Sequence, residues 1–120
     1  MSEISSLPQQ LQEQLLRLQQ LQQTLQIVTS QKQQLEFESS EVDKALEELK
    51  KMSDDVIVYK SVGSLLVKSE RKKVTDELHE KKELLEMRIK VLTRQQTRAQ
   101  ERTKELQQVI QERLKSSSFS

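Results

Sequence analysis

Apolar residues recur through most of this chain at alternating steps of three and four positions, the spacing of one stripe along an α-helix. In the first such series ten of thirteen positions are apolar. This regularity, sustained over about six heptads, predicts a helix with a coiled-coil seam, which we place at about residues 7–51. Its seam positions are Leu7, Leu11, Gln14, Leu18, Leu21, Leu25, Val28, Lys32, Leu35, Ser39, Val42, Leu46 and Leu49.

A second series of the same kind occupies the other half of the chain, where seven of the ten positions after Val74 are apolar. It predicts a second helix at about residues 70–115, with Ser69 as its N-terminal cap and a frayed tail at residues 116–120. Because the two arms are similar in length and joined by a short linker, we expect them to fold back antiparallel. The second seam consists of Val74, Leu78, Lys82, Leu85, Ile89, Leu92, Gln96, Ala99, Thr103, Leu106 and Ile110.

Between the arms the pattern changes to two short runs of β-branched and aliphatic residues, Val56–Tyr59 and Leu65–Val67. These runs predict a β-hairpin at about residues 55–68, with its turn in Ser61–Ser64. Gly63, the only glycine, is where a positive φ costs least. Both faces of both runs are apolar, and an isolated two-stranded hairpin is marginal in water. We therefore expect the hairpin to be a joint between subunits.

Apolar residues also gather at the ends of the arms away from the hairpin, where they occupy more than one stripe of each helix. An apolar surface wider than a two-helix seam can bury is typical of a binding surface. The alternative is that these residues only thicken the seam or contact another copy. They are Leu7, Leu11, Leu15, Leu16 and Leu18 in the first arm, with Val109, Ile110 and Leu114 in the second.

The composition narrows the range of functions. Aromatic residues make up 2% of the chain and charged residues 32%, which suits long helices better than a thick core and predicts a single domain over residues 1–120. Lys and Arg total 20 against 19 acidic residues, a balance that gives no reason to expect nucleic-acid or membrane binding. With no cysteine, signal peptide or membrane-spanning apolar run, we expect a soluble, cytoplasmic protein.

Residues that could carry catalysis are missing. A single glycine excludes the known phosphate-binding loops. The only histidine, His79, lies beside Glu80 and four residues before Glu83, which is typical of a charged helix surface rather than of a catalytic pair. No ligands recur at a metal-binding spacing. We therefore expect no enzymatic activity, no cofactor and no metal.

The hairpin sequence resembles a known family. Residues 54–63, DDVIVYKSVG, followed by LLVK at residues 65–68, resemble the hairpin of β-type prefoldin subunits, most closely the archaeal kind. In the arms, QQLE at residues 33–36 and ALEEL at residues 45–49 are similar to that family, as are Leu78, Leu85, Arg88 and the pair Arg94–Gln95. A single hairpin resembles the β-type, because the α-type carries two.

This resemblance implies a mainly α fold, a long antiparallel two-helix coiled coil whose central β-hairpin joins an intersubunit β-barrel. It implies a heterohexamer with α-type subunits and further β copies that captures unfolded client proteins without ATP and delivers them to a group II chaperonin. The helix-end residues named above would bind the client. The subunit interface would be formed by Val56, Ile57, Val58, Tyr59, Gly63, Leu65, Leu66 and Val67.

Two other interpretations remain open from the residues. One is a structural coiled-coil scaffold or tether that binds no client. The other rests on Arg94, Arg98 and Arg102, which recur every four residues on one helical face. These arginines suit either a solvated surface or a site for acidic clients or RNA. The absence of neighbouring aromatic residues, on which bases would stack, argues against RNA.

Overall fold

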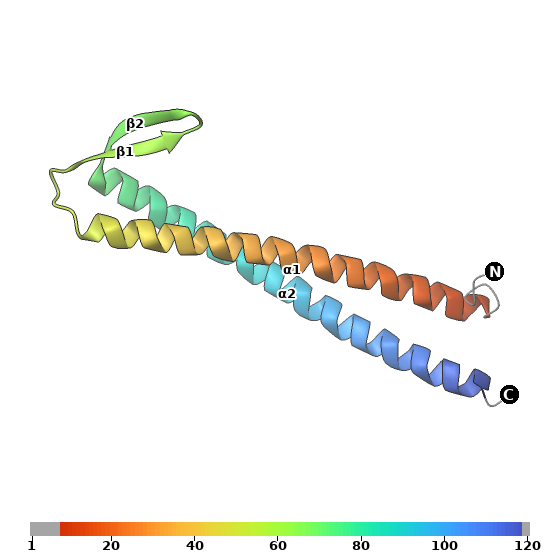
Figure 1. Ribbon diagram of the computed structural model, residues 1–120. Coiled ribbons are helices and arrows are strands. Elements are labelled where there is room, and N and C mark those ends of the chain that lie inside the picture. Colours follow the sequence, from red (N-terminus) through yellow and green to blue (C-terminus); the bar gives the residue numbers. More distant parts are fainter. Residues whose placement is uncertain (1–7, 119–120) are drawn as a thin grey trace. The chain divides into compact units, whose positions relative to one another are not determined.

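The computed structural model describes residues 8–118, which form four elements in chain order (Figure 1). Helix α1 spans Gln9–Lys50, strand β1 Ile57–Val62, strand β2 Leu65–Glu70 and helix α2 Arg71–Ser118. The predicted fold class, two long helices with an antiparallel β-hairpin between them, is confirmed. The expected seam residue Leu7 lies outside the described residues.

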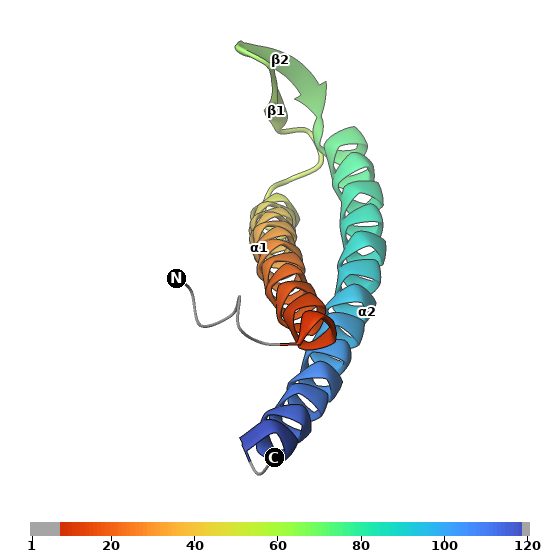
Figure 2. The ribbon, with the colours of Figure 1, turned by 90° about the vertical axis from the view of Figure 1, so that its right-hand side faces the viewer.

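The chain divides into two compact units, each containing part of both helices. The hairpin unit, Lys32–Val91, holds the end of α1, both strands and the start of α2. The helix-end unit holds the described residues before Lys32 and after Val91. Figure 2 shows the two strands of the hairpin unit next to the start of α2, with β2 leading directly into this helix.

The seam of the hairpin unit packs around a small apolar cluster. Val42, Leu46 and Leu85 are buried together, with Leu35 and Leu78 against them. Every seam position predicted in this part of the chain is buried or partly buried. The heptad spacing places these residues on one stripe of each helix, so each stripe is covered by the facing helix.

Ion pairs flank this seam on the hairpin unit. Lys82 is hydrogen-bonded to Asp43, and this bond raises the pKa of the lysine above its ordinary value. Lys81 Nζ lies 3.8 Å from Glu38 Oε1. Both pairs join α2 to α1, so they favour the register in which the seam residues meet. Because all four side chains are partly exposed, we expect each pair to contribute little to stability.

In the helix-end unit the seam includes polar residues, of which Thr103 and Gln96 form hydrogen bonds, whereas the buried Oε1 of Gln14 has no partner among residues 8–118. Thr103 is buried, and its Oγ1 donates to the carbonyl of Ala99, one turn earlier, at 2.7 Å. Gln96 Nε2 donates to Thr29 Oγ1 on the facing helix at 3.0 Å. A buried polar group that keeps a partner avoids most of the cost of burial. These bonds offset the cost of burying Thr103 and Gln96 in a seam that is otherwise mostly apolar.

The hairpin closes through a tighter turn than the sequence predicted. The last pair of the ladder is Val62 with Leu65, so the turn consists of Gly63 and Ser64. Gly63 has a φ of 58°, and no non-glycine residue among residues 8–118 has a positive φ. Glycine in this conformation at the first turn position is the pattern of a type II′ turn. The expectation that Ser61 and Val62 belong to the turn is therefore wrong, because both lie in β1.

The start of α2 also differs from the prediction. Ser69 lies in β2, where it pairs with Val58, and the helix begins two residues later, at Arg71. A cap precedes the first helical residue directly, so Ser69 is not the cap that was predicted. The ladder continues to Glu70 because β1 offers a partner as far back as Ile57. At its other end α2 continues to Ser118, so the predicted frayed tail is helical at residues 116–118, and residues 119–120 lie outside the described residues.

The neighbouring residues Leu85 and Leu84 allow a direct test of the seam, since their side chains are 3% and 56% exposed. We expect Leu85→Ala to lower the free energy of unfolding by about 2–5 kcal/mol, because it leaves a cavity in the seam. Leu84→Ala should change it by less than about 0.5 kcal/mol. Urea unfolding of the full chain followed by circular dichroism measures both, and equal effects would contradict the packing described.

Candidate functional site

The hairpin exposes apolar side chains on both of its faces. Side chains alternate across a strand, so Ile57 and Tyr59 share one face with Leu66, which lies between them and the turn. Leu66 is 74% exposed and Tyr59 65%. The opposite face carries Val58, Val62, Leu65 and Val67, of which only Val58 is partly buried. This is the surface that the sequence assigned to a subunit interface.

The strands of the hairpin have no neighbours on their outer edges among the described residues. The sheet consists of β1 and β2 alone, paired over six residues on each strand. The outward-facing backbone N–H and C=O groups of such strands are a template for pairing with another strand. The hairpin therefore combines two apolar faces with two open edges.

An ion pair ties the hairpin to the helix that follows it. Lys60 Nζ in β1 lies 2.7 Å from Glu77 Oε2 in α2. The hydrogen bond from Lys60 holds the pKa of Glu77 below its ordinary value. This pair lies at a cleft of about 540 Å³ whose lining includes Tyr59, Lys60 and Ser61 of β1 and Val74 and Leu78 of α2. It favours one orientation of the strands over the start of α2.

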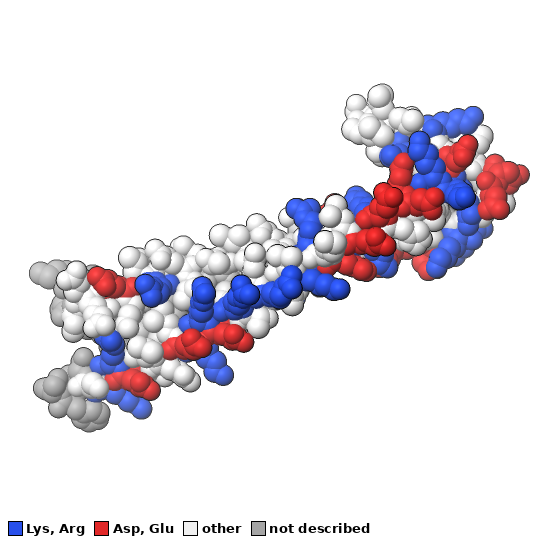
Figure 3. Space-filling model, turned by 180° about the vertical axis from the view of Figure 1, so that it is seen from behind, with Lys and Arg blue, Asp and Glu red and all other residues white. Residues whose placement is uncertain are grey.

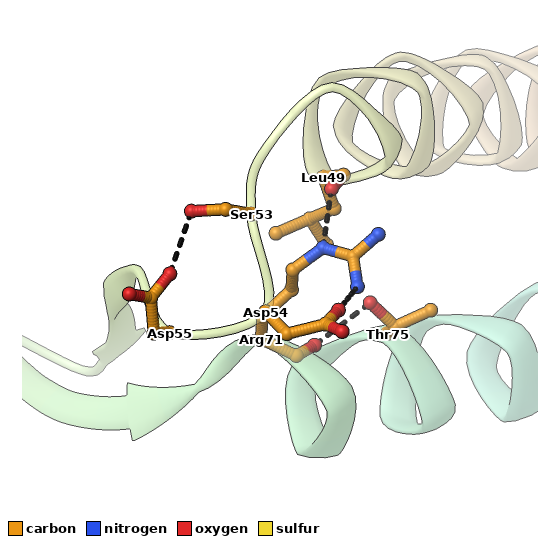
Figure 4. Close-up of polar contacts among 6 residues, drawn as sticks. All are labelled: Leu49, Ser53, Asp54, Asp55, Arg71 and Thr75. Carbon is orange, nitrogen blue, oxygen red and sulfur yellow. Dashed lines mark hydrogen bonds and ion pairs between the residues drawn. The ribbon is translucent and has the colours of Figure 1, made fainter.

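Arg71, the first residue of α2, links this helix to the end of α1 (Figure 4). Its Nε–H donates to the carbonyl of Leu49 at 2.6 Å, and its Nη1–H to Asp54 Oδ1 at 2.7 Å. The last carbonyls of a helix lack partners within it and carry partial negative charge, so a guanidinium stabilises them. One side chain thus holds the end of α1, the connecting loop and the start of α2 together.

The loop before β1 is ordered by its own hydrogen bonds. Ser53 Oγ donates to Asp55 Oδ1 at 2.8 Å, which lowers the pKa of this carboxyl group (Figure 4). The backbone N–H of Val56 donates to the carbonyl of Ser53 at 3.2 Å. The two acidic residues that open the hairpin motif therefore have separate structural partners, Asp54 with Arg71 and Asp55 with Ser53.

The residues that the sequence grouped as a client surface differ in burial within the helix-end unit. Leu11 and Ile110 are buried, at 2% and 5% exposure, so in this conformation they belong to the seam. Leu15 and Leu18 are partly buried. The exposed members are Leu16, Val109 and Leu114. Leu7 lies outside the described residues.

Sequence reasoning missed several residues of these surfaces. Val62 is half exposed and extends the apolar face of β1, which its period-two spacing from Val58 and Lys60 would have revealed. No local sequence pattern indicates the role of Arg71, because the carbonyl to which it donates belongs to Leu49, twenty-two residues earlier. Exposed apolar residues on the outer surfaces of the helices of the hairpin unit were also overlooked. They are Phe37, Leu84, Met87 and Val91.

Within residues 8–118 no three His, Cys, Asp or Glu side chains are grouped so that they could hold a metal ion. Neither described helix is long and apolar enough to cross a membrane.

Comparison with known proteins identifies the fold. A family model described as "Prefoldin subunit" matches residues 12–117. The chain belongs to the prefoldin family. The resemblance drawn from the hairpin and arm residues is thereby confirmed, and prefoldin subunits are chaperones.

Individual prefoldins agree over nearly the whole chain. The Pyrococcus furiosus prefoldin subunit beta is 44% identical over 112 residues, covering 93% of this chain and 96% of its own. The Archaeoglobus fulgidus prefoldin subunit beta is 47% identical over 108 residues, covering 90% and 93%. The crystal structure of the prefoldin beta subunit from Thermococcus strain KS-1 shares 44% identity and a TM-score of 0.83, covering 95% and 97%.

The Lys60–Glu77 pair predicts a pH dependence of the hairpin. Because the pKa of Glu77 is lowered in the folded chain, the pair stabilises the hairpin above the ordinary pKa of 4.5 and is lost as the pH falls below it. Tyr59, the only tyrosine in a chain without tryptophan, reports on the strand next to Lys60. We expect its fluorescence anisotropy to fall as the pH drops below about 4.5.

In Glu77→Gln this anisotropy should already be slightly lower at neutral pH and should show no step below pH 4.5. Asp55→Asn is the matched control, since the pKa of Asp55 is also lowered but its partner is Ser53. A titration of Glu77→Gln that matches the unsubstituted chain would rule out this role of the pair.

Proposed function

We propose that this chain is the β-type subunit of a heterohexameric prefoldin with two α-type and four β-type subunits. The observation that carries the proposal is the hairpin, which exposes apolar side chains on both faces and has two open edges. The assembly captures unfolded proteins without ATP and passes them to a group II chaperonin.

The hairpin supplies the joint between subunits. Strands of neighbouring subunits pair with the open edges of β1 and β2 and extend the two-stranded sheet into an intersubunit barrel. This pairing satisfies the backbone groups and covers Tyr59, Leu65 and Leu66, which are all more than half exposed in the single chain. Burying a large apolar side chain contributes about 1.5–3 kcal/mol, so a few such residues on each strand drive association.

The helix-end unit supplies the contact with client proteins. Leu16, Val109 and Leu114 are exposed there, and non-native polypeptides expose apolar side chains that can cover them. Each contact is weak. Six subunits held on one platform raise the effective concentration for every further contact, so affinity grows without a tight site. Release to the chaperonin then requires competition for the same apolar segments, not nucleotide hydrolysis.

Leu66→Asp tests the assembly role of the hairpin. We expect it to prevent the hexamer from forming with an α-type subunit, because it places a charge where strands of two subunits meet. Phe37→Asp is the matched control, since Phe37 is 67% exposed on α1 and lies outside the hairpin. Native mass spectrometry of the mixtures gives the oligomeric state, and circular dichroism should show unchanged helix content. A complete hexamer with Leu66→Asp would refute the assigned interface.

A triple substitution tests the contact with client proteins. Replacement of Leu16, Val109 and Leu114 by Ser should remove most of the protection of an aggregating client while the hexamer still forms. The control is the same replacement at Phe37, Leu84 and Met87, which are on average more exposed but lie in the hairpin unit. Light scattering at fixed ratios of hexamer to client measures protection. A hexamer that never suppresses aggregation would instead favour a structural scaffold.

A further inference from the structure

A groove of about 600 Å³ runs between α1 and α2 in the helix-end unit. Its volume lies in the range of pockets that hold a small ligand, and it is large enough for a few side chains. Three of the lining residues are apolar, namely Leu21, Leu106 and Val109. The others are Arg17, Gln20, Thr24, Arg102 and Glu105.

The groove lies in a unit with an excess of positive charge. The described residues of this unit contain seven Lys and Arg against four Glu. The basic residues are Arg17, Arg94, Arg98, Arg102, Lys104, Arg113 and Lys115, and the acidic ones are Glu13, Glu101, Glu105 and Glu112. The hairpin unit, by contrast, carries 13 Lys and Arg against 14 Asp and Glu.

The two units also differ in how their charges are paired. In the hairpin unit several Lys and Arg side chains form salt bridges, and Figure 3 shows red and blue side chains intermingled around the hairpin. In the helix-end unit neither arginine of the groove, Arg17 or Arg102, has a carboxylate within salt-bridge distance among the described residues. Their guanidinium groups are available to an anion from another molecule.

We propose that this groove is a client subsite that selects acidic-flanked apolar segments of non-native polypeptides. Leu21, Leu106 and Val109 contact a large aliphatic or aromatic side chain of the client. Arg17 and Arg102 attract an Asp or Glu next to it, because opposite charges beside an apolar wall interact more strongly than in bulk water. The inference rests on the proposed function, since it names the class of segment that the helix-end unit prefers.

Glu105 sets the size of this preference. It lines the same groove and repels a client carboxylate, so two cations act against one anion. The expected selectivity is therefore modest. Removing a positive charge from the groove should lower the preference for acidic segments, and removing the negative charge should raise it. Substitutions of both kinds can therefore test the groove.

The same cations could attract RNA, but the unit lacks what single strands require. Its described residues, 8–31 and 92–118, contain no Phe, Tyr or Trp on which a base could stack. The apolar floor of the groove instead matches an aliphatic or aromatic side chain. The positive charge and the apolar floor of the groove together favour a polypeptide segment that carries both a carboxylate and a large apolar side chain.

Two fluorescent peptides of equal length test the proposal on the full-length chain. Both contain Leu-Phe-Leu, flanked in one peptide by Asp and in the other by Lys. At low salt we expect the Asp peptide to bind about two- to five-fold more tightly by anisotropy, the range of exposed charge pairs. At about 1 M salt, where charges are screened within roughly 3 Å, the ratio should approach one. Equal affinities at low salt would overturn the proposal.

Three single substitutions then locate the effect. Arg102→Gln should lower the ratio of the two affinities, and Glu105→Gln should raise it. Arg98→Gln is the matched control, because it removes the same charge from α2 one turn before the groove. It should leave the ratio nearly unchanged. If Arg98→Gln lowers the affinity ratio as much as Arg102→Gln does, the preference comes from the overall positive charge of the unit. That result would overturn the assignment of the preference to the groove.

The outcomes also separate this inference from the proposed function. If the assembled protein protects clients but binds both peptides equally, the charge selectivity is wrong and the chaperone role stands. If it neither protects clients nor binds either peptide, both fail. Displacement of the Asp peptide by an unstructured RNA, but not by an uncharged polymer, would assign the groove to nucleic acid and overturn the polypeptide proposal.

Discussion

The structure depends on one narrow seam between two helices. Each helix offers a single heptad stripe, and the facing stripe covers it, so the buried apolar residues are almost all seam residues such as Leu46 and Leu85. Two helices enclose no second interior where other apolar side chains could go. Most large apolar residues outside the seam are therefore exposed in the single chain. The hairpin and the helix-end surface both follow from this constraint.

The two exposed surfaces differ in how specific they are. Strand pairing at the hairpin is directional, because each backbone N–H must meet a carbonyl and each residue has one partner in the ladder. Such a surface selects a particular strand in a particular register. In the proposed function the helix-end surface contacts clients through apolar side chains, which impose no preferred direction and suit clients of many sequences. Arg71 ties the start of α2 to the end of α1, and the Lys60–Glu77 pair ties β1 to α2, so both would hold the strands in place for the proposed pairing with a partner.

The sequence predicted those parts of the fold that depend on periodicity, because a repeat of side chains on one face is visible in the chain itself. All predicted seam positions among residues 8–118 are buried or partly buried, including polar ones such as Gln96. Predictions failed where contacts between distant residues decide the structure. Ser69 reads as a helix cap until its pairing with Val58 is known. The groove requires the register that brings Arg17 and Leu21 opposite Leu106 and Val109, and no local pattern reveals it.

The burial of Leu11 and Ile110 shows why an apolar cluster in a sequence does not define a binding surface. Both residues occupy seam positions, so the facing helix covers them, whereas Leu16 and Val109 lie one or more positions off the stripe and stay exposed. In the proposed function, seam burial and client binding therefore divide the same cluster between them. A client could contact Leu11 or Ile110 only if the two helices separated, and the packing between the helices would then be lost. Weak contacts to Leu16, Val109 and Leu114, repeated over several subunits, avoid that cost, so the exposed residues are better suited to reversible capture.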